Sequence, residues 1–128
     1  AILHASKSCT SVTIVDSGGG RLDHLLGVFS AMASDATSMI TCEAFLGSSY
    51  VRLVRDHYIV KPLASNLVSV FPFGGVAEGV SLSGFRWNLN DETLKPGSTR
   101  GLSNEILENF GDISVGKAVL LVIQSGLY

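Results

Sequence analysis

The chain has 128 residues, which is enough for one domain or for two small lobes that share a core. Its formal net charge of −2 gives no basic surface for nucleic acid or for an anionic membrane. Charged residues make up only 16% of the chain and hydrophobic residues 46%, so we expect an oligomer interface or another segment to cover apolar surface.

The apolar stretches are short and the cysteines are few. The longest strongly apolar stretch, 118–123, is far too short to span a membrane. Cys9 and Cys42 are too few for a zinc site or a disulfide scaffold, and we expect both to be small buried residues in a reducing compartment. No signal peptide is recognisable, so we predict a cytoplasmic protein.

The first predicted elements form a strand–helix–strand unit. The run 12–15 is β-branched and apolar, which is typical of a buried strand in a parallel sheet. From Leu22 to Met32 the apolar residues recur at helical spacing, which predicts a helix that ends at about Ser34. Residues 39–45 would form the second strand of this unit.

A glycine-rich turn, with the sequence GGGRLDH at residues 18–24, joins the first strand to the helix. Glycines let backbone N–H groups approach an anion, and the start of a helix adds a partial positive charge. Within the turn, Arg21 is suited to phosphate and Asp23 to a metal ion. The spacing matches neither a dinucleotide-binding fingerprint nor a P-loop, so the turn alone indicates only an anion site.

After residue 48 the pattern changes to short β-type runs separated by turn residues, as in a sandwich. The predicted strands are 50–55, 57–61, 67–73, 79–85, 86–89, 112–115 and 118–123. The predicted turns are Gly74-Gly75, Asn90-Asp91, Lys95-Pro96-Gly97 and Gly116-Lys117, the last as a type II′ hairpin loop. The predicted fold is therefore an α/β piece followed by an antiparallel β lobe.

Further motifs follow along the chain. They are GGRLDH at 19–24, VFPFGG at 70–75, Gly79-Val80, GFRWNL at 84–89, Leu94, Gly97, Ser98, RGLSNE at 100–105 and the closing strand from Gly116 to Ile123. Each motif is weak alone, but the ordered set is fairly specific and spans about residues 12–125. It resembles the thiamine pyrophosphokinase family, whose members move a pyrophosphoryl group from ATP to the hydroxyethyl arm of thiamine.

The resemblance implies a fold of two parts. Residues 1–48 would be the end of a parallel-sheet α/β domain that binds ATP, and residues 49–128 a jelly-roll-like β-sandwich that binds thiamine. It also implies a magnesium ion and a homodimer with each thiamine site near the subunit interface. The family's upstream acidic motifs, G-D-x-D-S and T-D, have no counterpart here, because Asp16 and Asp35 stand in a different context. We therefore expect this chain to be the C-terminal portion of such an enzyme and to be incomplete for catalysis alone.

At the ATP end, the predicted catalytic residues are Asp23 and Arg21. Pyrophosphoryl transfer needs metal ligands, cations and backbone amides around the phosphates. Asp23 would bind magnesium, or act only as a helix N-terminal acid that the macrodipole favours. Arg21 would clamp phosphate, or form a surface ion pair. Gly19, Gly20 and His24 would complete the nucleotide site, His24 by hydrogen bonding rather than by proton transfer.

At the thiamine end, the resemblance implies that Ser103 and Asn104 contact the aminopyrimidine, for which an Asn amide offers both a donor and an acceptor. The alternative is a turn that caps its own backbone. Trp87 would stack on the thiazolium or on the pyrimidine, although a lone Trp in a sandwich is also a common core residue. Arg100 would face phosphate, or be solvated.

Two hypotheses of different class remain open. The first is a magnesium-dependent thiamine pyrophosphokinase that uses ATP, to which this chain contributes the thiamine-binding lobe and part of the ATP site. The second is a non-catalytic thiamine-binding or oligomerisation module, which the missing acidic motifs favour.

Overall fold

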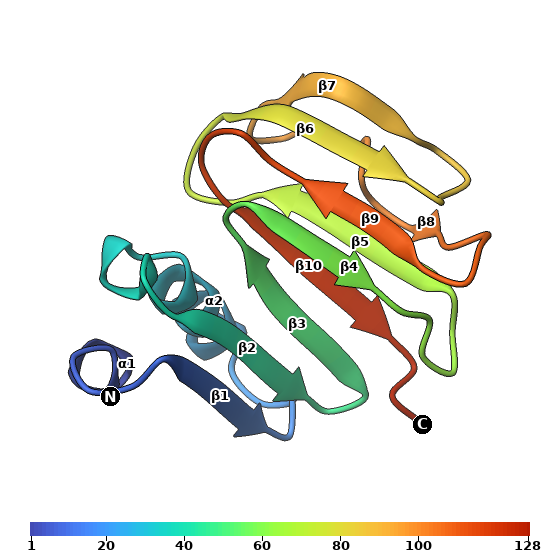
Figure 1. The fold of residues 1–128 in the computed structure, drawn as a ribbon. Coiled ribbons are helices and arrows are strands. Elements are labelled where there is room, and N and C mark those ends of the chain that lie inside the picture. The colour runs from blue at the N-terminus through green and yellow to red at the C-terminus, as the bar shows by residue number, and fades with distance from the viewer.

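The computed structural model describes residues 1–128, apart from the side chain of Leu3, and shows two packed β-sheets with one long helix at one end (Figure 1). The first sheet contains, in spatial order, β1 (Ser11–Asp16), β2 (Thr41–Leu46), β3 (Ser49–Val54), β10 (Leu120–Ser125), β5 (Leu67–Pro72) and β8 (Asn104–Glu105). The second contains β4 (His57–Val60), β9 (Gly111–Ser114), β6 (Ala77–Ser83) and β7 (Leu89–Leu94). The helical elements are α1 (Ile2–Ala5), α2 (Leu22–Met32) and the 3-10 turn η1 (Asp35–Thr37).

The predicted strand–helix–strand unit is present. β1 and β2 pair in parallel over their full lengths, and α2 connects them. The apolar stripe of α2 ends in Met32, which is fully buried in one cluster with Cys42 and Ala44 of β2. The helix ends two residues before the predicted end, and the Thr37 hydroxyl donates to the Met32 carbonyl (2.6 Å). This hydrogen bond satisfies one of the carbonyl groups that a helix end leaves unpaired.

β1 is not the buried strand that its composition predicts. Its side chains range from exposed to half-buried, and Val15 is 78% exposed. β1 lies at the edge of the first sheet and packs on one face only, because Ile14 contacts the cluster around Met32 whereas Thr13 and Val15 on the opposite face are exposed. The second predicted strand begins at Thr41 rather than at residue 39, and Met39 is exposed before it.

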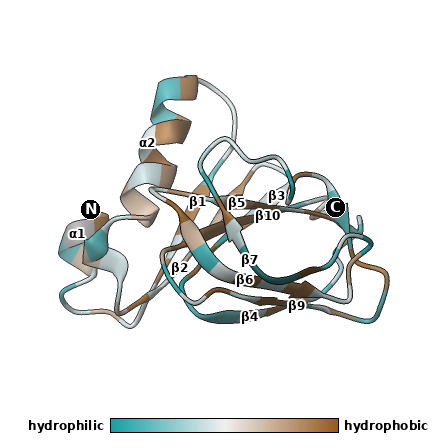
Figure 2. Ribbon diagram, turned by 90° about the horizontal axis from the view of Figure 1, so that it is seen from above, coloured by the Kyte–Doolittle hydropathy of each residue, from teal (hydrophilic) through white to brown (hydrophobic). Residues whose placement is uncertain are grey.

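Aliphatic side chains from both sheets fill the space between them, and the ribbon of β10, which contributes to this core, is brown for hydrophobic residues in Figure 2. Val60 of β4, Val80 of β6, Ile113 of β9 and Leu120 of β10 are all completely buried in this core. The predicted β-sandwich is therefore confirmed, and the chain as a whole is mostly β. The predicted boundary at residue 48 falls between β2 and β3, which are neighbours in one continuous sheet. The division into two domains stays a prediction.

The region around residues 86–91 differs from the prediction. Residues 86–89 form no strand of their own, and β7 instead runs through Asn90-Asp91, which we predicted as a turn. Leu89 and Leu94 at the ends of β7 are buried, while most of the residues between them are exposed. Shifts in the pairing of β6 with β7, together with φ of +50° at Asp91, let this polar stretch continue as a strand.

The predicted hairpin at Gly116-Lys117 is wrong. β9 pairs with strands of the second sheet and β10 with strands of the first, so the chain crosses between sheets at this turn. The N–H groups of Gly116 and Lys117 both donate to the Glu78 carbonyl (2.9 and 3.1 Å). A contact with β6, distant in the sequence, thus replaces the local hairpin bonds.

The two cysteines differ in environment, and apolar side chains remain at the surface. Cys42 is buried as predicted, and burial raises the pKa of its thiol. Cys9 is exposed, so the prediction of a buried residue is wrong there.

Large exposed apolar side chains include Val15 and, on α2, Leu22 and Leu26. Among the described residues, no helix is both long enough and apolar enough to cross a membrane.

Candidate functional site

The surface around Trp87 is built from two chain segments whose backbones are bonded to each other. One segment follows β6, and the other contains β8. The Arg86 N–H donates to the Glu105 carbonyl (2.8 Å), and the Leu107 N–H donates to the Gly84 carbonyl (3.0 Å). Gly84 has φ of +82°, a conformation that glycine adopts without strain. The two segments are therefore fixed relative to each other before any ligand binds.

The carboxamide of Asn104 joins these segments a second time. Asn104 is completely buried, and its Oδ1 accepts hydrogen bonds from the N–H groups of Trp87 (3.1 Å) and Glu105 (2.9 Å). Its Nδ2 donates to the Trp87 carbonyl (2.8 Å). Asn104 thus positions the Trp87 backbone. Its hydrogen bond from the Glu105 N–H agrees with the alternative that Asn104 caps the backbone of its own turn. Contact with a pyrimidine stays a prediction, because the Asn104 side chain has no exposed surface in this conformation.

The indole of Trp87 is 56% exposed, so it is not a core residue. The guanidinium carbon of Arg86 lies 5.7 Å from the centre of the Trp87 ring, within range of a cation–π interaction. Arg86 Nε also lies 2.8 Å from Glu105 Oε2. A planar cation therefore lies beside both an aromatic face and a carboxylate.

Ser103 and Arg100 lie on the loop that leads into β8. Ser103 has φ of +53°, and its N–H donates to Ser69 Oγ (3.0 Å). Arg100 Nη1 lies 2.6 Å from Glu92 Oε1 of β7, and this hydrogen bond lowers the pKa of Glu92 below its ordinary value. Arg100 is therefore engaged in an ion pair rather than only solvated, while its contact with phosphate stays a prediction.

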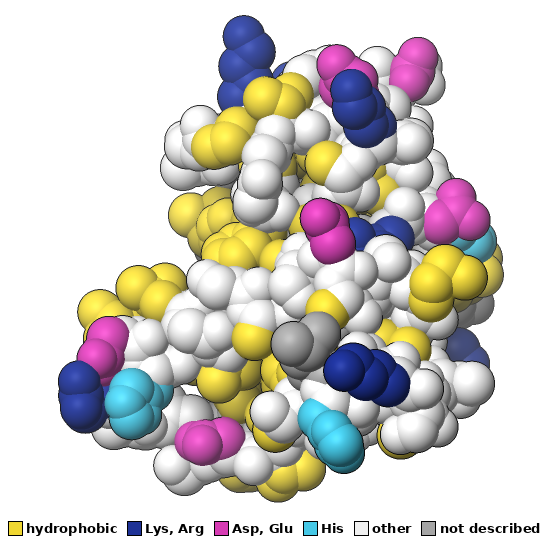
Figure 3. Space-filling model, turned by 90° about the vertical axis from the view of Figure 1, so that its left-hand side faces the viewer, with side chains coloured by type: hydrophobic (Ala, Val, Ile, Leu, Met, Phe, Trp, Pro, Cys, Tyr) yellow, Lys and Arg dark blue, Asp and Glu magenta, His cyan; other side chains and the backbone are white. Residues whose placement is uncertain are grey.

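The glycine turn lies at the opposite end, where β1 ends and α2 begins. Gly18 has φ of +73°, and a Cβ there would come within 2.8 Å of the Leu46 carbonyl carbon. Glycine is thus required where the turn packs on the end of β2. The turn borders a depression of about 240 Å³, whose wall includes Gly19, Gly20 and His24. Figure 3, which faces this end, shows apolar side chains among scattered charged ones.

Arg21 and Asp23 are bonded to each other in this turn. Arg21 Nη2 lies 2.5 Å from Asp23 Oδ2, and Nε donates to Oδ1 (3.1 Å). Both side chains are more than half exposed. Within the described residues no side chain caps the start of α2, so its first N–H groups face the turn without a side-chain acceptor. The pair matches the surface ion-pair alternative in this state, and its binding of phosphate stays a prediction.

The residues of the turn do not by themselves fit a magnesium ion. Asp16 and Asp23 border one open depression beside α2. Both oxygens of Asp23 are bonded to Arg21, and Asp16 Oδ1 accepts the Gly18 N–H (3.0 Å). In the part of the chain that the structure describes, no three His, Cys, Asp or Glu side chains lie close enough to hold a metal ion. The magnesium assignment of Asp23 stays a prediction.

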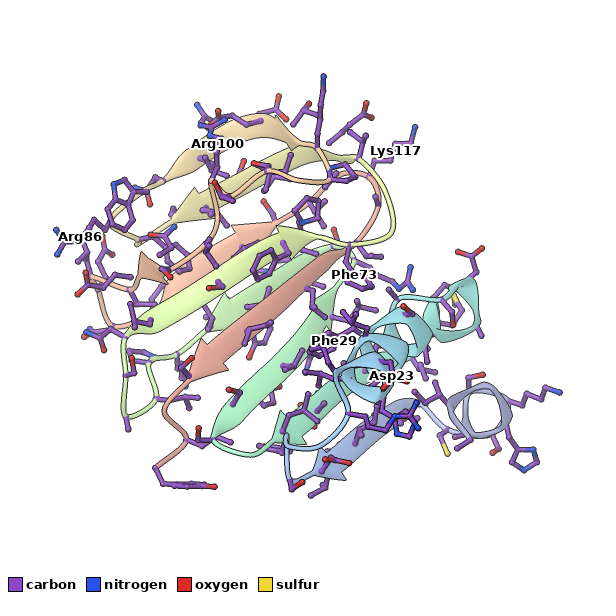
Figure 4. All side chains as sticks on the ribbon, turned by 180° about the vertical axis from the view of Figure 1, so that it is seen from behind. Asp23, Phe29, Phe73, Arg86, Arg100 and Lys117 are labelled. Carbon is purple, nitrogen blue, oxygen red and sulfur yellow. The ribbon has the colours of Figure 1, made fainter. Side chains whose placement is uncertain are left out.

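The two candidate regions lie far apart in one chain. Figure 4 shows Asp23 on α2 and Arg86 at the other side of the molecule, with the first sheet between them. The predicted site residues therefore form two groups. The first is the glycine turn with Gly19, Gly20, Arg21, Asp23 and His24, and the second is the Trp87 region with Ser103, Asn104 and the Arg100 loop.

Sequence reasoning did not identify Arg86 and Glu105 as site residues. Both stand in the recognised motifs GFRWNL and RGLSNE, but nothing in a spacing of 19 residues indicates that their side chains meet. Position next to Trp87 and next to Asn104 was the only available signal.

Most of this chain resembles known proteins in sequence. The family described as "Thiamin pyrophosphokinase, vitamin B1 binding domain" matches residues 56–120. Thiamine pyrophosphokinase of Bacillus subtilis (strain 168) is 28% identical over 109 residues, which are 84% of this chain and 51% of the relative. The chain thus spans about half the length of this curated relative.

Solved structures give the same result. The crystal structure of thiamine pyrophosphokinase from Bacillus subtilis superposes with a TM-score of 0.85 at 25% identity, over 96% of this chain and 59% of that one. Thiamin pyrophosphokinase from Candida albicans superposes with a TM-score of 0.72 at 10% identity, over 90% of this chain and 44% of that one, a likeness of fold alone. The resemblance recognised in the sequence is confirmed.

Proposed function

Because the chain belongs to the family of the thiamin pyrophosphokinase vitamin B1 binding domain, we propose that the protein containing it transfers a pyrophosphoryl group from ATP to thiamine and releases AMP. In this proposal residues 49–128 bind thiamine and residues 1–48 are the end of the ATP-binding α/β domain. The observation that carries it is the exposed indole of Trp87, fixed by Asn104 within the matched region. A cytoplasmic location belongs to the same proposal.

Thiamine would bind over the Trp87 surface. An indole face attracts a cation, and the thiazolium ring of thiamine is a planar cation. The Ser103 hydroxyl and the Asn104 amide are the polar groups proposed for the aminopyrimidine, and the completely buried Asn104 side chain would first have to be uncovered. Because Asn104 fixes the Trp87 backbone by two hydrogen bonds, stacking on the indole would cost little backbone ordering on binding.

ATP would bind with its phosphates at the glycine turn. The start of α2 and the backbone N–H of Gly20 favour an anion, the Gly19 N–H would turn from Ser17 Oγ (3.4 Å), and Arg21 from Asp23, to phosphate oxygens. His24 would add a hydrogen bond from the wall of the depression. Magnesium neutralises charge on phosphates, and it enters the proposal only for the complete protein, because the residues described here do not hold it by themselves.

A homodimer is part of the proposal because the two regions are separated within one chain. Transfer requires that the hydroxyl of thiamine and the phosphates of ATP meet, and Asp23 and Arg86 lie at opposite sides of the molecule (Figure 4). A second copy would place its Trp87 surface near the glycine turn of the first. Light scattering at micromolar concentration should give twice the monomer mass, and a clean monomer would contradict the dimer.

The reaction is tested by thiamine-dependent release of AMP from ATP by the complete protein. We expect Asp23→Asn to lower turnover about a hundredfold in the complete protein, where the Asp23 carboxylate would help to hold the magnesium ion that neutralises the phosphates. Asp35→Asn is the matched control, because Asp35 is also exposed but lies on η1, outside the depression. Absence of AMP release in the unmodified complete protein would contradict the reaction, and full activity of Asp23→Asn would remove Asp23 from it.

The second candidate is a non-catalytic thiamine-binding or oligomerisation module. The ion pair that occupies both oxygens of Asp23 favours it. Calorimetry separates the two candidates, since thiamine binding without ATP turnover in the complete protein would support the module.

A further inference from the structure

The Arg86 side chain occupies the aromatic face that the proposed function assigns to thiamine. Its guanidinium carbon lies 5.7 Å from the centre of the Trp87 ring, and its Nε donates to Glu105 Oε2 at 2.8 Å. A guanidinium is planar and carries one positive charge, as does a thiazolium. The free protein thus already holds a planar cation between an indole and a carboxylate.

The three residues differ in how firmly they are held. The Trp87 backbone is bonded to the buried Asn104 at 3.1 and 2.8 Å, and the backbones of Arg86 and Glu105 are bonded at 2.8 Å. The Arg86 side chain, in contrast, is 51% exposed, and that of Glu105 is 33% exposed. The guanidinium can therefore leave for solvent while the backbones that carry the indole and the carboxylate stay in place.

We propose that Arg86 is an internal competitor of the substrate, and that Glu105 is the counter-ion that selects a cationic ring. This inference rests on the proposed function, because it takes the Trp87 surface as the thiamine site. When the thiazolium binds, Arg86 leaves the Trp87 face, and the Glu105 carboxylate pairs with the incoming ring. A neutral pyrimidine gains no such charge pairing, so it competes poorly with Arg86.

Fluorescence titration of the 128-residue chain can test this directly, because Trp87 is its only tryptophan. We expect Arg86→Gln to lower the Kd for thiamine about threefold to fivefold, the size of one exposed cation–π contact. Glu105→Gln should raise the Kd for thiamine by a similar factor. Arg86→Gln should also tighten binding of the neutral probe 4-amino-5-hydroxymethyl-2-methylpyrimidine, because the competitor is gone. Glu105→Gln should leave its Kd within about twofold of that of the unmodified chain, because the probe has no charge for Glu105 to pair with.

Lys117→Gln is the matched control. It also removes one positive charge from an exposed ion pair, with Glu78 at 3.9 Å, but Lys117 lies away from Arg86 (Figure 4). It should leave the Kd for thiamine unchanged. An equal gain in Lys117→Gln would show a net-charge effect and would overturn the role of Arg86.

A second probe, the 3-methylthiazolium cation, separates failure of this inference from failure of the proposed function. Thiamine binding that is unchanged or weaker in Arg86→Gln would overturn the competitor while leaving thiamine binding intact. Binding of 3-methylthiazolium that tightens in Arg86→Gln, without any thiamine binding, would support the competitor and contradict the function. Absence of binding of both cations to every variant would overturn both.

Discussion

Two exposed ion pairs between an arginine and a carboxylate mark the two ends of this molecule, and they are built differently. Arg21 and Asp23 are two residues apart at the start of one helix. Arg86 and Glu105 are 19 residues apart and meet because buried Asn104 and backbone hydrogen bonds join their segments. The Trp87 region is thus formed by the fold, whereas the glycine turn offers local groups that can rearrange around phosphate.

We therefore expect the Trp87 region to contribute more to the free energy of unfolding than the glycine turn. Asn104→Ala removes three hydrogen bonds and leaves the N–H and carbonyl groups of Trp87 without partners. We expect a loss of about 3 kcal/mol in the free energy of unfolding, measured by urea denaturation with Trp87 fluorescence. Asn90→Ala, at an exposed position on β7, is the control and should change stability by less than about 0.5 kcal/mol. A similarly small loss in Asn104→Ala would mean that the region is not fixed by the fold.

At the glycine turn, the rigid part is the backbone of Gly18. Gly18→Ala combines the strain of φ +73° with a Cβ only 2.8 Å from the Leu46 backbone, and should cost about 2 kcal/mol or more. Gly20→Ala tests strain alone, because φ is +93° but no atom lies within 4 Å of the added Cβ. We expect it to cost about 1 kcal/mol in thermal or urea unfolding. Equal effects of the two substitutions would contradict the close packing of Gly18 on β2.

Acidic pH should lower the stability of the first sheet around Glu43 of β2. The Tyr50 hydroxyl donates to Glu43 Oε2 (2.5 Å) and, with Thr13 and Arg52, lowers the pKa of Glu43 below its ordinary value of 4.5. The folded state therefore binds a proton less readily than the unfolded state. This stabilisation is complete above pH 4.5 and is lost as the pH falls through the lower folded pKa.

Glu43→Gln should therefore cost about 1 kcal/mol at pH 7 and flatten the decline in stability below pH 4.5. The measurement is the urea midpoint from pH 7 to pH 3. Glu108→Gln, at an exposed position, should keep the pH dependence of the unmodified chain. A profile for Glu43→Gln that parallels the unmodified one would show that another group causes the acid sensitivity.

The smallest effect is expected at the Arg21–Asp23 pair. Arg21→Gln should change the free energy of unfolding by less than about 0.5 kcal/mol, because both side chains are more than half exposed. Trp87 emission should also stay the same, since the pair lies at the other side of the molecule (Figure 4). A large loss of stability, measured by urea denaturation, would mean that the turn is a fixed part of the fold.

Sequence patterns predicted the elements that local periodicity controls. The apolar spacing in α2 and the β-branched runs of β3, β5 and β10 placed these elements within a few residues. Contacts that are distant in the sequence account for the failures. Asn90-Asp91 has turn chemistry, but its flanking leucines are buried in the core, and Gly116-Lys117 changes sheets because Glu78 accepts its N–H groups.

The candidate site shows the same limit. The motifs identified Trp87, Ser103 and Asn104, but residue types alone could not show that the amide of Asn104 holds the Trp87 backbone. The apolar character of Trp87 favoured a place in the core rather than at the surface. Its exposure follows from the bonds between two segments, which no local pattern records.

The place of β10 in the first sheet affects how the protein folds during synthesis. β10 lies between β3 and β5, and Leu120 is paired with both Val54 and Pro72. Strand pairings between segments so far apart in the sequence form slowly, because the ends of a long intervening chain must first come together. The centre of this sheet is formed by a strand that is synthesised after the strands it pairs with, so these earlier strands emerge with unpaired edges. A nascent chain that stalls before residue 120 would therefore be a substrate for chaperones rather than a folded intermediate.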